Sequence, residues 1–206
     1  MTRQVSVWPF VAAMAAVVAA SNFLVQFPFQ HFGLQDLLTW GAFTYPVAFL
    51  VTDLTNRRYG PAAARKVVYV GFAIAVVLSI WLASPRIAIA SGSAFLVAQL
   101  LDVYVFDRLR HRVWWQAPLI SSVLGSIIDT IIFFSLAFAA RFAFLDTGFG
   151  LEDGSLGFAV PFFGADVPLW VSLALGDFTV KIVIGLLMLA PYGALLSVLR
   201  PLPSVR

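Results

Sequence analysis

The chain has 206 residues, of which 61% are hydrophobic and 11% are charged, and its mean hydropathy is +0.94. Soluble domains contain about 25% charged residues, so this composition excludes a soluble globular protein and predicts a membrane protein with several spans. The absence of cysteine excludes disulfides, thiolate metal sites and cysteine nucleophiles. The two histidines are too few for a His-rich metal site, and no long polar stretch could form a nucleic-acid-binding domain, so we expect no nucleic-acid partner.

Six apolar segments predict six membrane-spanning helices in a single all-α domain over residues 1–206. A helix rises ~1.5 Å per residue, so about 20 residues cross the ~30 Å hydrocarbon core of a bilayer. We expect the spans at residues 5–25, 37–54, 67–83, 87–106, 119–140 and 167–199. The first is not followed by a signal-peptidase-like site, so we expect an uncleaved span.

Two of these segments have features that a simple span lacks. Pro46 falls inside the second segment and should kink it. The last segment is too long for one perpendicular crossing, so it either tilts or begins outside the bilayer. Before it, residues 141–166 are too polar and too rich in glycine for a span. We expect a loop there that can carry a short helix or a lid across one mouth of the bundle.

Lysine and arginine are distributed unevenly over the connecting segments. The second and fourth loops contain four and three of them, whereas the first, third and fifth loops contain none, one and one. Arg3 precedes the first span, and Arg200 and Arg206 follow the last. Because basic loops stay in the cytoplasm, this distribution predicts that both termini and the even-numbered loops are cytoplasmic.

Asp129 lies near the middle of the apolar segment 119–140. A carboxylate at that depth is unfavourable by ~2.5–3.5 kcal/mol on insertion scales, and such groups normally face a bundle interior or a watery cavity. Asp129 is therefore a functional candidate. The structural alternative is a protonated side chain that only joins two helices.

Other polar residues lie at comparable depth. Asp177 and Lys181 are four residues apart on one helix face, with the acid first, which is the favourable order for a pair. Gln99 and Asp102 are three residues apart and also share a face. Together with Asn22, these side chains could converge on one polar cavity. The candidate substrate-binding residues are Asn22, Gln99, Asp102, Asp129, Asp177 and Lys181.

Each candidate also has a structural interpretation. Asp177 and Lys181 can neutralise each other within one helix. Asn22 and Gln99 can form hydrogen bonds between helices, which are worth only ~0.6 kcal/mol each. Two further acids, Asp53 and Asp107, lie beside arginines at the predicted cytoplasmic edge, where we expect charge partners or helix-end anchors.

These polar residues occur in patterns similar to those of a known family. The run FLVTD at 49–53, after Tyr45-Pro46, resembles the second span of the queuosine precursor transporters, also called the vitamin uptake transporter family. The runs SGSAF (91–95) and LDVYVF (101–106), with Gln99, resemble its fourth span. The features that resemble its fifth span are Ser121-Ser122, Asp129-Thr130 and Phe133-Phe134. The features that resemble its last span are Lys181 and Pro191-Tyr192. The resemblance covers residues 43–192, except that 141–166 matches no family pattern.

The resemblance implies import of 7-cyano-7-deazaguanine or 7-aminomethyl-7-deazaguanine across the bacterial inner membrane. We expect no cofactor, metal or catalytic residue. A deazaguanine has an N–H edge that a carboxylate can accept in bidentate fashion, beside a carbonyl acceptor. We expect Asp129 or Asp102 to bind the amine edge, and Gln99, Asn22 and Lys181 to bind the carbonyl and orient the base. Aromatic side chains, 15% of the chain, can stack on the ring, which is worth ~1–3 kcal/mol per base.

The sequence alone also leaves two other functions open. A substrate-binding membrane subunit for a vitamin-like solute would need a separate energising module, since nothing in the chain resembles a P-loop. An intramembrane enzyme could use an Asp pair, but the chain has neither H-E-x-x-H nor G-x-S-x-G, and we expect no enzyme activity. We prefer a secondary transporter in the lipid bilayer. Stripes of small residues such as Ser122, Ser126 and Thr130 would permit a homodimer.

Overall fold

The computed structural model describes residues 6–31, 38–162, 164–197 and 199. Its helices are α1 (Trp8–Leu24), α2 (Gly41–Thr44), α3 (Pro46–Tyr59), α4 (Pro61–Leu82), α5 (Pro85–Leu109), α6 (Gln116–Phe138) and α8 (Leu169–Leu196). Between α6 and α8 lie the 3-10 helix η1 (Ala140–Phe142), the short α7 (Phe144–Thr147) and an antiparallel hairpin of β1 (Ala159–Phe162) and β2 (Ala165–Pro168).

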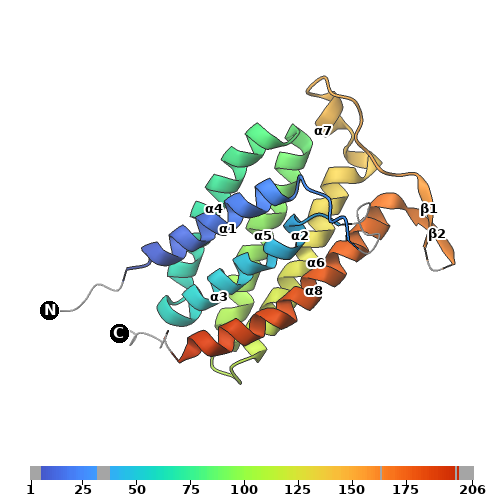
Figure 1. Ribbon diagram of the computed structural model, residues 1–206. Helices are drawn as coiled ribbons and strands as arrows, with labels where there is room; N and C mark the ends of the chain where they lie inside the picture. Colours follow the sequence, from blue (N-terminus) through green and yellow to red (C-terminus); the bar gives the residue numbers. More distant parts are fainter. Residues whose placement is uncertain (1–5, 32–37, 163, 198, 200–206) are drawn as a thin grey trace.

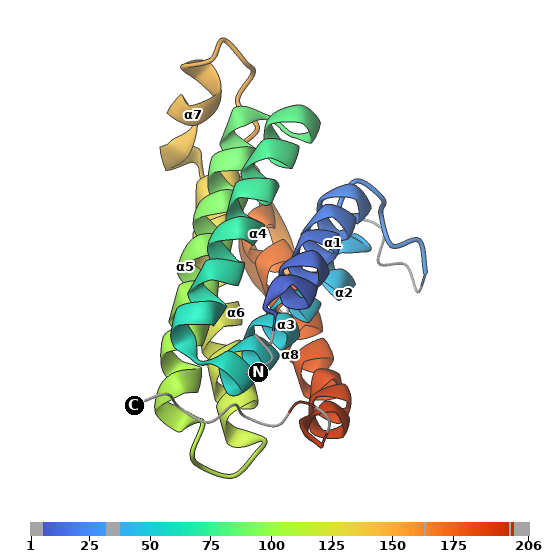
Figure 2. The same ribbon diagram turned by 90° about the vertical axis from the view of Figure 1, so that its left-hand side faces the viewer.

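The long helices run roughly along one direction and form a single bundle (Figure 1). Helix α1 begins and α8 ends at the same end of this bundle, while α7 and the hairpin lie at the opposite end. Helices α4, α5 and α6 lie side by side (Figure 2), and α3 packs on α4, α5 and α8. Helix α8 also packs on α6, so α3, α5, α6 and α8 enclose the interior.

Within the described residues, four helices, α4, α5, α6 and α8, are long and apolar enough to cross a membrane. Helix α1 is also apolar but has only 17 residues. Large apolar side chains point outward from these helices, for example Trp81, Ile131 and Leu187. Soluble monomers rarely expose large contiguous apolar surfaces, so the structure agrees with a predominantly helical membrane protein. The prediction of an all-α chain omitted the small β-hairpin.

The second predicted span consists of two helices that meet at a proline. Helix α2 ends at Thr44 and α3 begins at Pro46. Proline suits the first turn of a helix, because its φ is already helical and its missing N–H is not needed there. The predicted span is therefore interrupted directly before Pro46, and the change of direction stays a prediction. The predicted start of this span at residue 37 lies outside the described residues.

The region between the second and third predicted spans is mostly helical, which corrects the prediction of a loop there. Helix α3 continues past residue 54 to Tyr59, and α4 begins at Pro61. The single connecting residue is Gly60, whose φ of +85° lies in a region that glycine adopts without a steric penalty. Asn56 and Arg57 therefore extend the helix instead of forming a loop.

The remaining predicted spans correspond to α1, α4, α5, α6 and α8, with ends shifted by several residues. With 28 residues, α8 is ~42 Å long at 1.5 Å per residue, which exceeds the thickness of a hydrocarbon core and agrees with the expectation that it is too long for one perpendicular crossing. Parts of the sequence prediction lie outside the described residues: the start of the first span at residue 5, residue 198 within the last span, and Arg3, Arg200 and Arg206.

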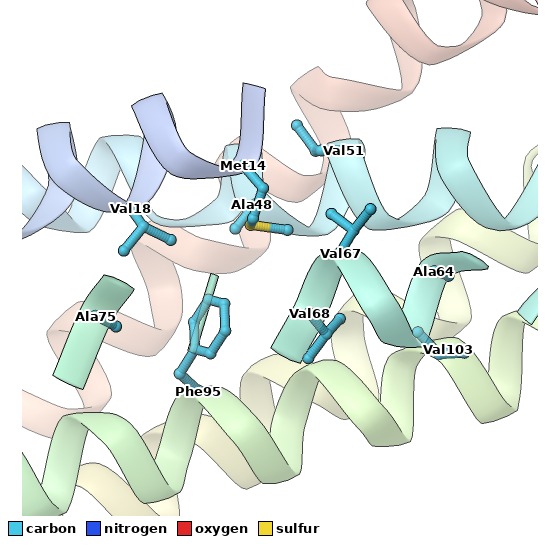
Figure 3. Close-up of a cluster of buried hydrophobic side chains, with 10 residues drawn as sticks. All are labelled: Met14, Val18, Ala48, Val51, Ala64, Val67, Val68, Ala75, Phe95 and Val103. Carbon is cyan, nitrogen blue, oxygen red and sulfur yellow. The ribbon is translucent and has the colours of Figure 1, made fainter. Parts of the chain in front are cut away.

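The main apolar core lies where α1, α3, α4 and α5 meet (Figure 3). Its buried side chains are Met14, Val18, Ala48, Val51, Ala64, Val67, Val68, Ala75, Phe95 and Val103. Gly71 of α4 lets Met14 approach closely, because a Cβ there would lie 2.7 Å from Met14 Cγ. This packing fixes α3 against α5, the two helices that carry one of the polar groups described below.

The segment between α6 and α8 is attached to the bundle by Arg86, at the beginning of α5. Its buried guanidinium donates to Asp146 Oδ2 at 2.8 Å and to the carbonyls of Leu136 and Ala139 at 2.8 and 2.7 Å. At the exposed rim, Arg86 also lies 3.3 Å from Asp153, and hydrogen bonds from Ser155 lower the pKa of the Asp153 carboxyl. These contacts hold α7 and the following loop in place.

Candidate functional site

Lys181 is the centre of a buried ionic cluster between α6 and α8. Its Nζ donates to Asp129 Oδ2 at 2.7 Å and also pairs with Asp177 on its own helix. Tyr45 Oη donates to Asp129 Oδ1 at 2.9 Å, and Thr130 Oγ1 donates to Asp177 Oδ2 at 3.4 Å. The side chains of Lys181 and Asp129 are each 5% exposed. We call these five residues the Lys181 cluster.

Local structure explains how the cluster forms. Asp177 and Lys181 are one turn apart, so they lie on one face of α8, and this helix packs against α6. Tyr45 is the residue at the break between α2 and α3, and its ring lies 5.4 Å from Lys181 Nζ, within the range of a cation–π contact. Both carboxylate oxygens of Asp129 therefore have a donor, which is what makes a buried ion pair tolerable.

A second buried polar group lies between α3 and α5. Thr52 Oγ1 donates to Gln99 Oε1 at 2.6 Å, and Ser121 Oγ of α6 donates to Asp53 Oδ1 at 3.4 Å. Asp53 and Asp102 interact electrostatically, and their exposed fractions are 2% and 0%. We call Thr52, Asp53, Gln99 and Asp102 the Asp102 group.

The Asp102 group contains polar atoms that the fold leaves unpaired. In the part of the chain that the structure describes, neither oxygen of Asp102 nor Nε2 of Gln99 has a hydrogen-bond partner. Native proteins pair most of their buried polar groups, and an unpaired one is unfavourable by ~1–3 kcal/mol. Because Gln99 and Asp102 are three residues apart on α5, one donor and two acceptors lie on the same face. This set matches a ligand that presents two N–H groups next to a carbonyl.

Arg57 and Tyr192 lie beside the Asp102 group, toward the end of the bundle where α8 ends. Arg57 Nε donates to Tyr192 Oη at 2.9 Å, and the guanidinium also donates to the carbonyl of Arg110. The guanidinium lies 5.3 Å from the centroid of the Phe106 ring. These contacts join α3, α5 and α8, and the charge of Arg57 acts on Asp53.

Two small cavities lie on either side of the Lys181 cluster. One is lined by Lys181, Asp53 and Tyr192, with Phe49 and Ser126 among its other walls, and it has room for about one water molecule. The other lies toward the end that carries α7. Its polar walls are Ser21, Asn22, Tyr45 and Ser91. Contacts between Tyr45, Asp129 and Lys181 therefore separate one cavity from the other.

Five of the six residues predicted as a substrate site fall into two groups instead of one. Asp129, Asp177 and Lys181 lie together in the Lys181 cluster, and Gln99 and Asp102 lie in the Asp102 group. Asn22 belongs to neither. Its Nδ2 donates to the Val18 carbonyl of its own helix, and its Oδ1 accepts from Ser79 Oγ at 3.2 Å. Asn22 therefore joins α1 to α4, although it also lines the same cavity as Tyr45.

Sequence reasoning missed several residues at these sites. It gave no site role to Tyr45, Thr130, Thr52 or Arg57, and it treated Asp53 as a charge partner or anchor at the membrane edge. Asp53 is instead buried against Asp102. The spacing of Thr52 and Asn56 could have indicated a polar face along α3, since residues four apart lie on one side of a helix. The companion prediction for Asp107 is confirmed, because it lies 3.3 Å from Arg110.

Comparison with known proteins places this chain among membrane transporters. The family described as putative vitamin uptake transporter matches residues 39–84 and 79–195, which include both polar groups but not Asn22. A "Probable queuosine precursor transporter" of Haemophilus influenzae and the "Queuosine precursor transporter" of Escherichia coli are each 34% identical over 89% of this chain and 83% of their own length. A "Probable queuosine precursor transporter" of Bacillus subtilis is 31% identical over 53% of this chain and 59% of its own.

These matches confirm the resemblance that the sequence patterns indicated. No solved structure is significantly similar to the chain.

Proposed function

We propose that this chain, which belongs to the putative vitamin uptake transporter family, imports queuosine precursors across the inner membrane of a bacterial cell. The precursors are 7-cyano-7-deazaguanine and 7-aminomethyl-7-deazaguanine. The six crossings are α1, the pair α2–α3, α4, α5, α6 and α8, with both termini in the cytoplasm. Relatives with this name and the apolar outer surface of the bundle support the proposal.

The observation that carries this proposal is the set of unpaired atoms in the Asp102 group. Asp102 would accept the ring N–H and the exocyclic amine of a deazaguanine in bidentate fashion, while Gln99 Nε2 donates to the neighbouring carbonyl. Asp129, the other residue expected at the amine edge, already receives hydrogen bonds from Tyr45 and Lys181. Asp102 is therefore the better acceptor for the base.

The surroundings of Asp102 supply the remaining parts of a base site. Phe49 lines the cavity between the two polar groups and provides a ring on which a base can stack. With room for about one water molecule, this cavity does not admit a bicyclic base in the present arrangement of helices. We therefore take this conformation to be closed. The base binds when α3 and α5 separate, and Lys181 and Asp177 meet the base when the contacts of the Lys181 cluster open.

Ligand-dependent thermal unfolding tests the substrate and the site together. The melting temperature of the purified protein is followed by tryptophan fluorescence with 7-cyano-7-deazaguanine, guanine, 7-deazaadenine and biotin. A ligand at 100 times its Kd stabilises the folded state by ~2.7 kcal/mol. We expect stabilisation by the deazaguanine and none by 7-deazaadenine or biotin, because a 7-deazaadenine lacks the two neighbouring N–H groups and the carbonyl.

Variants then assign the binding residue. Asp102→Asn replaces one acceptor oxygen with a donor, and we expect at least a tenfold rise in Kd, which corresponds to ~1.4 kcal/mol. The matched control is Asp107→Asn, which changes a partly exposed acid on the same helix and should bind as the unmodified protein does. Equal binding by Asp102→Asn would remove Asp102 from the site. Absence of stabilisation of the unmodified protein by any deazaguanine would contradict the proposed function.

A further inference from the structure

The neighbourhood of Asp102 contains more negative than positive charge. Asp53 on α3 and Asp102 on α5 are buried next to each other, and Arg57 is the cation that acts on Asp53. Two carboxylates beside one guanidinium leave one negative charge without a partner. The groups that face this pair from other helices are Ser121 on α6, and Tyr192 and Lys181 on α8.

Lys181 does not supply the missing positive charge. Its ammonium is already paired with two carboxylates, those of Asp129 and Asp177. It therefore has no positive charge left to neutralise Asp53 or Asp102. Tyr192 accepts a hydrogen bond from Arg57, and Ser121 donates to Asp53 Oδ1. These two neutral groups orient the pair but do not neutralise it.

Asp102 provides a second, independent observation. It is fully buried, and among the residues that the structure describes both of its oxygens are without a hydrogen-bond donor. An ionised carboxylate in such surroundings is strongly disfavoured, and buried acids usually take up a proton instead. Two carboxyl groups that interact in one apolar site titrate as a pair, and the first proton that they bind removes their mutual repulsion.

We propose that Asp53 and Asp102 share one proton and that this proton crosses the membrane together with the substrate, which makes the chain a proton symporter. This inference rests on the proposed function. When Asp102 accepts the two N–H groups of the base, its proton passes to Asp53, so that the pair keeps one proton and, with Arg57, has no net charge. Asp53 lines the cavity that also reaches Tyr192, and we assign this side as the route by which the proton leaves for the cytoplasm.

The Lys181 cluster is a poorer candidate for this role. Asp129 accepts hydrogen bonds from Tyr45 and Lys181, and Asp177 accepts from Thr130 and pairs with Lys181. This cluster also contains two carboxylates and one cation, but each of its carboxylates accepts hydrogen bonds. Asp102 accepts none from the described residues, so burial favours a proton more strongly on Asp102 than in the Lys181 cluster. We therefore assign proton coupling to Asp53 and Asp102. The Lys181 cluster separates the two cavities.

Charge movement by the reconstituted protein tests this inference. The full chain is placed in liposomes, and current is recorded when 7-cyano-7-deazaguanine is added in sodium-free buffer. This base has no net charge at neutral pH, so any current comes from an ion that moves with it. We expect an inward current that grows when the outer solution is made more acidic. A pH-sensitive dye inside the vesicles should report acidification with about one proton per base taken up.

The variant Asp53→Asn separates proton coupling from binding of the base. We expect its current to fall at least tenfold, while exchange of labelled base between the two sides of the vesicle remains detectable, because the amide of the new side chain cannot carry a proton but keeps the shape of the carboxyl group. Asp53→Glu should restore current, and Asp107→Asn should behave as the unmodified protein. Full current in Asp53→Asn would overturn the inference.

Two results with the unmodified protein keep the inference separate from the proposed function. Uptake of labelled base without current and without acidification would overturn proton coupling and leave the proposed function intact. Absence of any uptake or binding of deazaguanines would overturn the proposed function itself. If Asp53→Asn does not fold, the dye measurement on the unmodified protein still decides whether protons move with the base.

Discussion

Buried carboxylates are stabilised in two different ways in this bundle. In the Lys181 cluster, Asp129 and Asp177 share one ammonium and accept further hydrogen bonds from Tyr45 and Thr130. In the Asp102 group, no hydrogen bond reaches Asp102 from any residue that the structure describes. The first arrangement pairs both carboxylates within the protein in the closed conformation, whereas the second favours a proton or a ligand as partner.

The first prediction concerns Lys181. Lys181→Met leaves Asp129 and Asp177 buried without their cation, and removal of one partner from a buried ion pair is unfavourable by ~3–5 kcal/mol. We expect a clear fall in the melting temperature in detergent, followed by tryptophan fluorescence. Adding Asp129→Asn to this variant removes one of the stranded carboxylates and should restore part of the loss.

The control for this prediction is Arg110→Gln, which breaks the partly exposed contact with Asp107. Such pairs contribute ~0–1 kcal/mol, so the melting temperature should change little. A Lys181→Met variant as stable as the unmodified protein would show that the cluster does not hold α6 and α8 together. A double variant no more stable than Lys181→Met would show that Asp129 is not the partner that matters.

Sequence spacing predicted only part of these contacts. The Asp177–Lys181 pair follows from a separation of four residues on one helix. The partners of Asp129 could not be predicted in this way, because Lys181 and Tyr45 are 52 and 84 residues away along the chain. Periodicity shows which side chains share a face, but it does not show which faces meet. For this reason one polar cavity was expected where the structure has two groups.

At the scale of elements, hydropathy located most of the long helices but misjudged where they end. Residues 55–66 contain several polar and basic side chains and therefore look like a loop. Arginine and lysine are nevertheless good helix formers, so α3 and α4 extend through this region on either side of Gly60. The hairpin β1–β2 was missed because its strands have only four residues each, too few for a clear alternation of polar and apolar residues.

The second prediction concerns the attachment of the segment that includes α7. Arg86→Gln removes the cation that is buried against Asp146 and bonded to the carbonyls of Leu136 and Ala139. Leaving Asp146 unpaired should destabilise the protein by ~3–5 kcal/mol. We also expect faster cleavage in residues 148–158 by added protease, because the loop would no longer be held against α5.

Asp153→Asn is the matched control, since it changes the exposed partner of the same arginine. We expect a much smaller effect on melting temperature and cleavage than in Arg86→Gln. Because the pKa of Asp153 is lowered in the folded state, its contact contributes above the ordinary pKa of an aspartate and is lost as the pH falls through the lowered value. Equal effects of the two variants at neutral pH would show that Asp146 is not the important partner.

At the scale of the whole molecule, charge differs between the two ends of the bundle. Arg57, Arg58, Arg108 and Arg112 lie near the end where α8 ends. The opposite end carries α7 and the acidic residues Glu152 and Asp153 in the following loop. The positive-inside rule therefore assigns the basic end to the cytoplasm, and this orientation would place Arg57 and Tyr192 at the cytoplasmic mouth and Asn22 near the outer one.

The last prediction tests that orientation, and the sequence makes the test simple because it contains no cysteine. Glu152→Cys and Arg112→Cys each introduce one thiol at an exposed position, at opposite ends of the bundle. We expect a membrane-impermeant maleimide to label Glu152→Cys in intact spheroplasts and to label Arg112→Cys only after permeabilisation. Since both positions are exposed, a difference in labelling reports the side of the membrane and not burial. The reverse result would invert the bundle, so that the cavity lined by Asp53 would face outward and the proposed proton would leave on the wrong side for uptake.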